Sequence, residues 1–221
     1  MSTENSSHVG SYAHLHFLVL IWGFTAVIGK LISIPAMDVV FYRTFFAFIV
    51  LYLIVKFRKS SLAIGKRNFY AIFGTGSIIA SHWILFFLAA RVWNVSICLA
   101  GMATTSIWTS VLEPILLKRK VKIYEPILGF IALVGISVVF RSVLNQYIGF
   151  LIAVFSAMLS SIFTIINGQL VKKSDHYVIS FYQMLGASIC SLIFMLIYSF
   201  GISGKSIEWN MTQSDLIYLL V

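Results

Sequence analysis

The chain has 221 residues, of which 60% are hydrophobic and only 10% are charged, and its mean hydropathy is +0.96. A soluble domain is typically about 25% charged and about 45–50% apolar, so this composition excludes most soluble folds. Lys and Arg outnumber Asp and Glu by 16 to 7, which gives a formal net charge of +9. The basic residues lie in short tracts between apolar runs, which indicates membrane orientation rather than nucleic-acid binding.

The N-terminal segment 1–13 is polar but contains no Lys or Arg, and the apolar run that follows is too long for a signal-peptide core. We therefore expect a short cytoplasmic segment at 1–13 and a first helix that stays in the mature protein. Cys98 and Cys190 both lie inside apolar runs. This position favours packing roles over a disulfide framework or a metal site.

Seven apolar runs approach the length of about 20 residues that crosses a bilayer as a helix. They lie at 14–33, 38–55, 69–91, 95–117, 123–141, 147–171 and 177–200. An eighth run opens at Asp215 and is cut off at the last residue, so the chain is expected to be a truncated part of a longer protein. Barrel strands would alternate apolar and polar residues, which these runs do not. We predict an all-α fold, a polytopic integral membrane helix bundle.

The basic residues of the loops predict the orientation of the bundle. Loops 56–68, 118–122 and 172–176 carry five, four and two Lys or Arg residues, whereas the alternate loops carry three in total. The loops after the second, fourth and sixth helices, and with them the N-terminus, are therefore expected on the cytoplasmic side.

An internal repeat relates the two parts of the chain. The segment VFYR at 40–43 corresponds to SFYQ at 180–183, and the interval from Trp22 to Lys30 matches that from Ser161 to Gln169. The sixth and seventh helices thus repeat the first and second.

A repeat unit of five helices is odd in number, so the second copy is inserted upside down relative to the first. We predict a first unit at 14–141 and an incomplete second unit at 147–221. Inverted repeats of this kind are typical of secondary transporters, whose binding sites lie near the midplane between the halves.

Several segments resemble the EamA-type drug/metabolite transporter superfamily. They are LIWGFTAVIGK at 20–30, Arg43 just inside the second helix, FFLAARVWNVSICLAG at 86–101 and ILGFIALVGISVV at 127–139. The order and spacing of these segments carry the resemblance, which covers 14–221. It implies ten helices in two inverted halves, both termini cytoplasmic, and transport of amino acids, similar organic solutes or drugs across the cytoplasmic (inner) membrane. A small-molecule substrate and the lipid bilayer are the implied partners, with no cofactor and no nucleic acid.

The sequence also departs from this family. Ile107 aligns where members commonly have a Pro in the fourth helix, and Lys120 stands where an acidic residue is common. We expect Glu113-Pro114 to supply the kink of that helix instead. Small multidrug exchangers depend on a buried Glu in their first helix, but the first helix here has no acidic residue. Their proton-coupled mechanism is therefore not carried over.

Two cations mark a candidate substrate entrance, because ionisable residues inside spans usually face a cavity or a partner. Lys30 and Arg43 lie toward the external ends of the first two helices, where they could capture an anionic group, Arg43 with its planar fork. Alternatively, Lys30 reaches the lipid headgroups and Arg43 pairs with Asp38.

His82 and Trp83 fall near the middle of the third helix, at the depth of transporter sites. The imidazole could bind substrate or relay a proton, or it could bond a neighbouring helix. Thr104, Thr105 and Trp108 reach a similar depth in the fourth helix. Their hydroxyls could line a polar path, or they could bond back to their own helix.

Glu113 is the one carboxylate clearly within a predicted span and is the best proton-linked candidate. Alternatively, it pairs with Lys118 or Arg119. At the inner side, Asn167, Gln169 and Gln183 repeat the positions of the outer cations, which predicts a neutral polar ring.

The stripe of Gly149, Ala153, Ala157 and Ser161 recurs every four residues and predicts close helix packing.

The motifs of soluble chemistry are missing. The sequence contains no GxxxxGK[ST], HExxH, CxxC or GxSxG, so neither ATP-driven transport nor enzymatic activity is indicated. A membrane enzyme would need clustered His and acidic residues, and the densest His group lies in the N-terminal region at 8–16. A bundle that serves only as an assembly partner would lack midplane polar residues such as His82.

The predicted orientation can be tested with single cysteines placed in loop 56–68 after both native cysteines are replaced. They should resist an impermeant thiol reagent added outside intact cells, because the loop is expected in the cytoplasm. Cysteines placed in the loop at 92–94 are the matched control and should react. Rapid labelling within 56–68 contradicts the orientation.

Overall fold

The computed structural model describes residues 2–141, 146–203 and 212–220, and these are helical almost throughout. The elements in chain order are α1 (Ser2–Leu31), α2 (Ala36–Phe57), α3 (Lys66–Val92), α4 (Val95–Met102), α5 (Thr105–Leu117), α6 (Tyr124–Arg141), α7 (Tyr147–Leu170), α8 (His176–Leu196), the π-helical η2 (Ile197–Ser203) and α9 (Gln213–Leu220). No strand occurs in these described ranges. The predicted all-α helix bundle is confirmed.

Among the described residues, 6 helical segments are long and apolar enough to cross a membrane. They are Tyr12–Leu31, Ala36–Phe57, Lys66–Val92, Val95–Leu117, Tyr147–Leu170 and His176–Gly201. These segments match six of the seven predicted spans. The remaining predicted span, 123–141, coincides with α6, which is not among the six. Helix α1 begins at Ser2 and therefore includes the polar residues before Tyr12.

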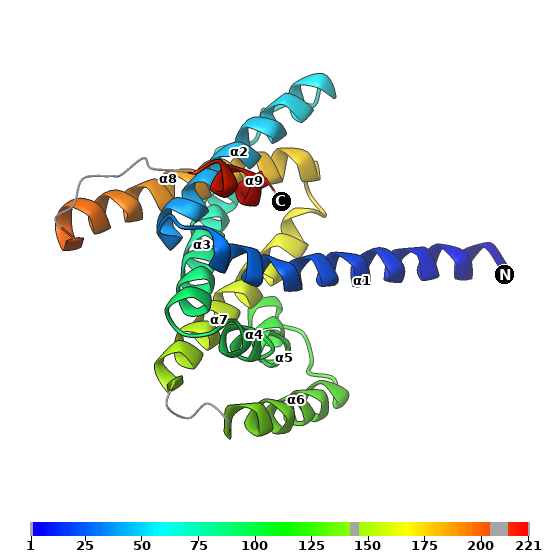
Figure 1. The fold of residues 1–221 in the computed structure, drawn as a ribbon. Coiled ribbons are helices and arrows are strands. Elements are labelled where there is room, and N and C mark those ends of the chain that lie inside the picture. Colours follow the sequence, from blue (N-terminus) through cyan, green and yellow to red (C-terminus); the bar gives the residue numbers. More distant parts are fainter. Residues whose placement is uncertain (1, 142–145, 204–211, 221) are drawn as a thin grey trace.

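The centre of the molecule is formed by α2, α3, α7 and α8. Helix α8 packs against α2 and α3, while α7 packs against α3, α4 and α5. Figure 1 shows α6 and the N-terminal part of α1 projecting away from this centre. Because α2 and α3 belong to the predicted first unit and α7 and α8 to the second, the interior lies between the two units.

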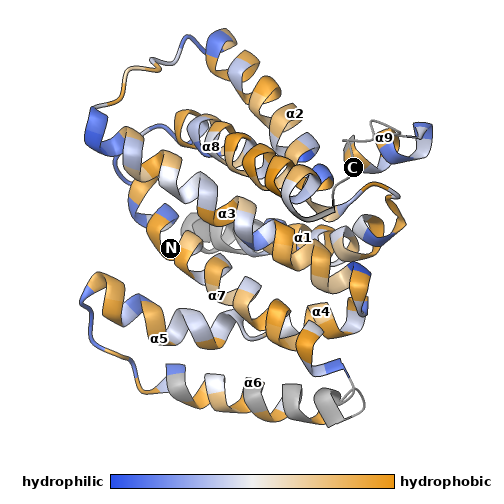
Figure 2. Cartoon of the chain, turned by 90° about the vertical axis from the view of Figure 1, so that its left-hand side faces the viewer, coloured by the Kyte–Doolittle hydropathy of each residue, from blue (hydrophilic) through white to orange (hydrophobic). Residues whose placement is uncertain are grey.

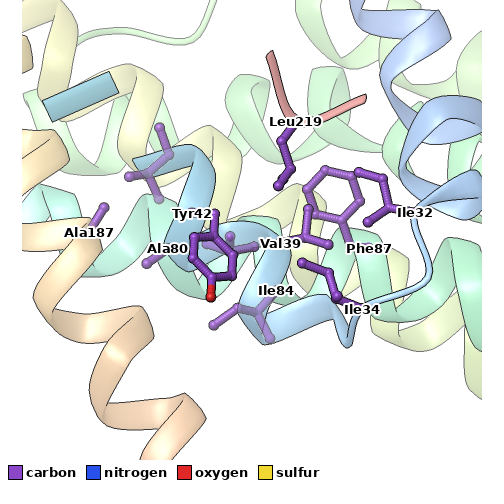
Figure 3. Close-up of a cluster of buried hydrophobic side chains, with 11 residues drawn as sticks. Ile32, Ile34, Val39, Tyr42, Ala80, Ile84, Phe87, Ala187 and Leu219 are labelled. Atoms are coloured by element: carbon purple, nitrogen blue, oxygen red, sulfur yellow. The ribbon is translucent and has the colours of Figure 1, made fainter. Parts of the chain in front are cut away.

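A buried apolar cluster joins the loop after α1, the start of α2, and parts of α3, α8 and α9. Its members are Ile32, Ile34, Val39, Val40, Tyr42, Ile79, Ala80, Ile84, Phe87, Ala187 and Leu219. Figure 3 shows Leu219 of α9 in this cluster together with Phe87 and Ile32. The short helix α9 is therefore anchored to the bundle by its apolar face.

The repeated segments occupy matching places in their helices. VFYR at 40–43 holds the fifth to eighth positions of α2, which begins at Ala36, and SFYQ at 180–183 holds the same positions of α8, which begins at His176. This register agrees with the sequence repeat.

The small-residue stripe on α7 is a packing surface, as predicted. Ala153, Ala157 and Ser161 are fully buried, and a Cβ built on Gly149 would lie 2.5 Å from the Cγ of Trp93. A Cβ built on Gly101 of α4 would lie 2.4 Å from that of Ala153. Small side chains thus permit close approach of α4 to α7.

The predicted fourth span, 95–117, forms one membrane-length segment that contains a short break. Helix α4 ends at Met102 and α5 begins at Thr105. The break lies upstream of Glu113-Pro114, and Pro114 lies inside α5, which continues to Leu117. At the break the hydroxyls of Thr104 and Thr105 donate to the carbonyls of Gly101 and Met102, each at 2.6 Å. Hydroxyl groups can re-satisfy backbone carbonyls in this way inside a membrane.

The contact between α3 and α8 depends on Gly76, and this generates a prediction. A Cβ on Gly76 would lie 2.4 Å from the carbonyl oxygen of Gln183 and 2.9 Å from the amide nitrogen of Ala187, both backbone atoms. Gly76→Ala should therefore lower the free energy of unfolding by about 1–3 kcal/mol through overpacking. The measurement is the thermal unfolding midpoint in detergent.

Gly74 is the matched control on the same helix, because a Cβ there would meet nothing within 4 Å. Gly74→Ala should leave the midpoint unchanged or raise it, since Ala favours helix more than Gly does. Equal midpoints for the two variants contradict the close contact.

Candidate functional site

His82 links α3 to α7 in the middle of the bundle. Its Nδ1 lies 2.8 Å from the hydroxyl of Ser156 and 3.0 Å from the Ser156 carbonyl oxygen, and the Ser156 hydroxyl donates to the His82 carbonyl at 2.8 Å. Both side chains are buried. Of the roles considered for His82 from the sequence, the structure shows the hydrogen bond of the imidazole to a neighbouring helix. Trp83, the next residue, is half-buried and packs against the apolar cluster.

The hydroxyls of α5 are bonded to backbone, and a pair of them reaches α7. Thr109 donates to the Thr105 carbonyl at 2.8 Å, and its hydroxyl lies 3.0 Å from that of Ser161. Ser161 itself donates to the Thr105 carbonyl at 2.9 Å. Thr104, which precedes α5, is buried, and Trp108 on α5 is half-buried. The break between α4 and α5 is thus tied to the small-residue face of α7.

A buried amide connects three helices at a third place. The side-chain amide of Gln183 on α8 donates to the hydroxyl of Thr75 on α3 at 3.1 Å and to the Asn167 oxygen on α7 at 3.0 Å. Gln169, two residues beyond Asn167, is half-buried. Of the three residues predicted to form a polar ring, Asn167 and Gln183 are hydrogen-bonded to each other, and the structure adds Thr75 to this pair.

Arg43 is half-buried, and its guanidinium carbon lies 5.9 Å from the centroid of the Phe87 ring. A cation over an aromatic face is attracted by the ring quadrupole. The ion pair between Arg43 and Asp38 that the sequence suggested does not form. Among the described residues, the ion pairs found are those of Arg119 with Glu113 and Glu125. Lys30, by contrast, is exposed.

Glu113 pairs with Arg119, as the sequence alternative proposed. The Arg119 guanidinium lies 3.0 Å from a carboxylate oxygen of Glu113 and 2.9 Å from one of Glu125. The hydrogen bonds to Glu113 and then to Glu125 raise the pKa of Arg119 above its ordinary value. This pair connects α5 to the start of α6 at a partly exposed position.

Arg91 at the end of α3 and Asp215 at the start of α9 form polar contacts with the loop between α1 and α2. Arg91 donates from Nε to the Gly29 carbonyl at 2.9 Å, and its other nitrogens donate to the carbonyls of Ile32 and Ile34. Asp215 accepts from the amide of Ser33 at 2.7 Å and from the Ser33 hydroxyl at 2.6 Å. These residues were not among the sequence candidates.

The family assignment follows from a match that covers more than half of the chain. The sequence model of the EamA-like transporter family matches residues 13–141. The chain belongs to the EamA-like transporter family. No curated protein matches the chain. The matched region coincides with the predicted first five-helix unit, so this EamA-like protein is a multi-pass membrane transporter of the drug/metabolite type. Members of this family are transporters and not enzymes.

In this EamA-like transporter the predicted site residues do not converge on one point. His82, Thr105 and Gln183 lie in three separate groups of hydrogen bonds, which join α3 to α7, α5 to α7, and α8 to α3 and α7, respectively. Within the described residues, no group of three or more His, Cys, Asp or Glu side chains could hold a metal ion.

The capping role of Asp215 could have been recognised from the sequence. Thr212 and Asp215 form a reciprocal N-terminal cap, because the Thr212 hydroxyl accepts from the Asp215 amide at 3.1 Å and Asp215 accepts from the Thr212 amide at 3.0 Å. A Thr followed three residues later by an acidic residue is a recognised signal for a helix start. No comparable local pattern predicts the bonds between Asp215 and Ser33, because the two residues lie 182 positions apart.

Proposed function

We propose that this EamA-like protein is a secondary transporter that moves small organic solutes across the cytoplasmic (inner) membrane. The substrates are amino acids, similar metabolites or drugs, and transport proceeds by alternating access between two inverted halves. The family match over residues 13–141 carries this proposal. The matched residues correspond to the five spans of the first unit expected from the sequence repeat, which the structure forms as helices α1 to α6.

The packing of the bundle supports a pathway between the halves. The polar groups at His82, Thr109 and Gln183 all bridge helices of the first unit to α7 or α8 of the second. The break between α4 and α5 lies beside them, and discontinuous helices at the repeat interface are a common feature of binding sites in secondary transporters.

The proposed orientation places the N-terminus and the basic loops in the cytoplasm. Figure 2 shows the hydrophilic loops after α2 and after α5 on the same side of the molecule. This side carries most of the basic residues in the loops, as expected for the cytoplasmic face.

Arg43 is the proposed contact for an anionic group of the substrate. Its charge is half-buried beside Phe87 and forms no ion pair with a described carboxylate. A guanidinium in this state can receive a carboxylate in a bidentate geometry. Glu113 is proposed to act through its ion pair with Arg119 rather than as a proton carrier.

Reconstitution of the purified protein into liposomes tests the proposed function. We expect uptake or counterflow of at least one labelled solute from a panel of amino acids, nucleosides and cationic drugs, without ATP. Liposomes that contain no protein are the control. Strict dependence on nucleotide hydrolysis, or no flux for any member of the panel, contradicts the proposal.

Arg43 and Lys30 provide a matched pair for the substrate contact, because both are cations near the same end of the bundle but only Arg43 is half-buried. Arg43→Gln should reduce kcat/KM for anionic or zwitterionic solutes about 10-fold or more, since a charge-assisted hydrogen bond is lost. Lys30→Gln should change it less than about twofold. Flux measured at equal amounts of reconstituted protein checks this. Unchanged flux of anionic or zwitterionic solutes in Arg43→Gln, or equal losses in both variants, removes Arg43 from the site.

A further inference from the structure

We propose that Asp215 and Ser33 form a latch that keeps one end of the transport pathway closed and that separates during each transport cycle. This inference rests on the proposed transport function and adds to it a specific gate. The latch is defined as the contact between the Asp215 carboxylate and the loop residue Ser33. Arg91 bonds the same loop through backbone carbonyls.

The Asp215 carboxylate of the latch is buried and accepts several hydrogen bonds. Asp215 is only 1% exposed and accepts the amide and hydroxyl of Ser33 together with the amide and hydroxyl of Thr212. Hydrogen bonds to a carboxylate are shorter and stronger than those between neutral groups, and those from Ser33 are 2.7 and 2.6 Å long. The loop is therefore held firmly to the start of α9.

The Arg91 side holds the same loop to α3. The guanidinium donates to the carbonyls of Gly29, Ile32 and Ile34, which are free at the end of α1 and beyond it. Asp38 in the first turn of α2 and Asp215 are the carboxylates whose charges act on Arg91. The loop between α1 and α2 thus lies between a cation and an anion that come from different units of the protein.

The contact does more than cap a helix, as a comparison within the chain shows. Asp175 at the start of α8 accepts the amides of Tyr177 and Val178, both in its own helix. Asp215, in the first turn of α9, takes part in the cap through Thr212 but adds two bonds to Ser33, which lies 182 positions away. A cap alone does not require these bonds, so they connect α9 of the second unit to the first unit.

The position of the latch matches one end of the pathway. The end of α1, the start of α2, the end of α3 and the start of α9 meet there, which the alternation of helices assigns to the external side. Beneath the contact, Leu219 packs with Ile32 and Phe87 in the buried apolar cluster (Figure 3). Breaking the bonds of Ser33 would therefore free α9 and its apolar face to move away from the loop, within the range of gating motions in transporters.

The first experiment measures access to a buried reporter without measuring transport. Val39 in the cluster is fully buried, and Val39→Cys in a background of Cys98→Ala and Cys190→Ala provides a thiol beneath the latch. Its reaction with an impermeant maleimide is measured on purified protein in detergent. Asp215→Ala should raise the labelling rate about 10-fold, because the carboxylate bonds are lost.

Two matched controls separate the latch from helix capping. Asp175→Ala removes a cap carboxylate without a bond to another unit, and should leave the labelling rate near that of the parent. Ser33→Ala and Thr212→Ala each remove one hydroxyl that donates to the same Asp215 oxygen, at 2.6 and 2.8 Å. Only Ser33→Ala should raise the rate, by about threefold or more. This pair decides the question if Asp215→Ala fails to fold. Equal rates in Ser33→Ala and Thr212→Ala overturn the latch.

The second experiment asks whether the contact must open. In the double variant Ser33→Cys with Asp215→Cys, oxidation should reduce solute flux in liposomes at least tenfold, and reduction should restore it. Undiminished flux in the fully crosslinked protein overturns the gating role. Parent protein that moves no solute contradicts the proposed function instead, whereas the labelling rates still report on the contact itself.

Discussion

The structure depends on one constraint, which is that polar groups inside a hydrocarbon layer must find their partners within the protein. Several buried polar side chains at the centre of this bundle are bonded to a neighbouring helix. His82 bonds Ser156, and Gln183 bonds Thr75 and Asn167. Since no water is available there to replace a lost partner, these bonds fix which helices lie side by side.

If the protein transports a solute, some of these hydrogen bonds must be broken and replaced by others. Those of His82 and Gln183 connect α3 to α7 and α8, and those of Asp215 connect α9 to the loop after α1. In the proposed mechanism these elements belong to opposite halves. Movement of one half against the other therefore has to break some of these bonds and to form others, and a substrate with polar groups can supply replacements.

Close approach of the helices is the second condition for this arrangement. Ala153 and Ser161 on α7 are fully buried. Gly76 of α3 lies so close to α8 that a Cβ built on it would be 2.4 Å from the carbonyl oxygen of Gln183. Without the bulk of larger side chains, the helices come near enough for short hydroxyls such as those of Thr109 and Ser161 to meet. Packing between helices is a main source of association in membranes, where lipid tails are as apolar as the side chains.

The sequence by itself determined the class of the protein, the family and six of the seven predicted spans, because length, apolarity and the order of motifs are local properties. It also identified the packing role of the stripe on α7 and the pairing of Glu113 with Arg119, which lies only six residues away. The break at Thr104 was missed, since it has no proline and depends on hydroxyls that bond back to the preceding carbonyls. Only the tertiary structure decided the partners of Arg43, Arg91 and Asp215. Those partners come from other helices or from loops far along the chain, and a local pattern cannot specify which of many distant residues folding brings within hydrogen-bonding distance.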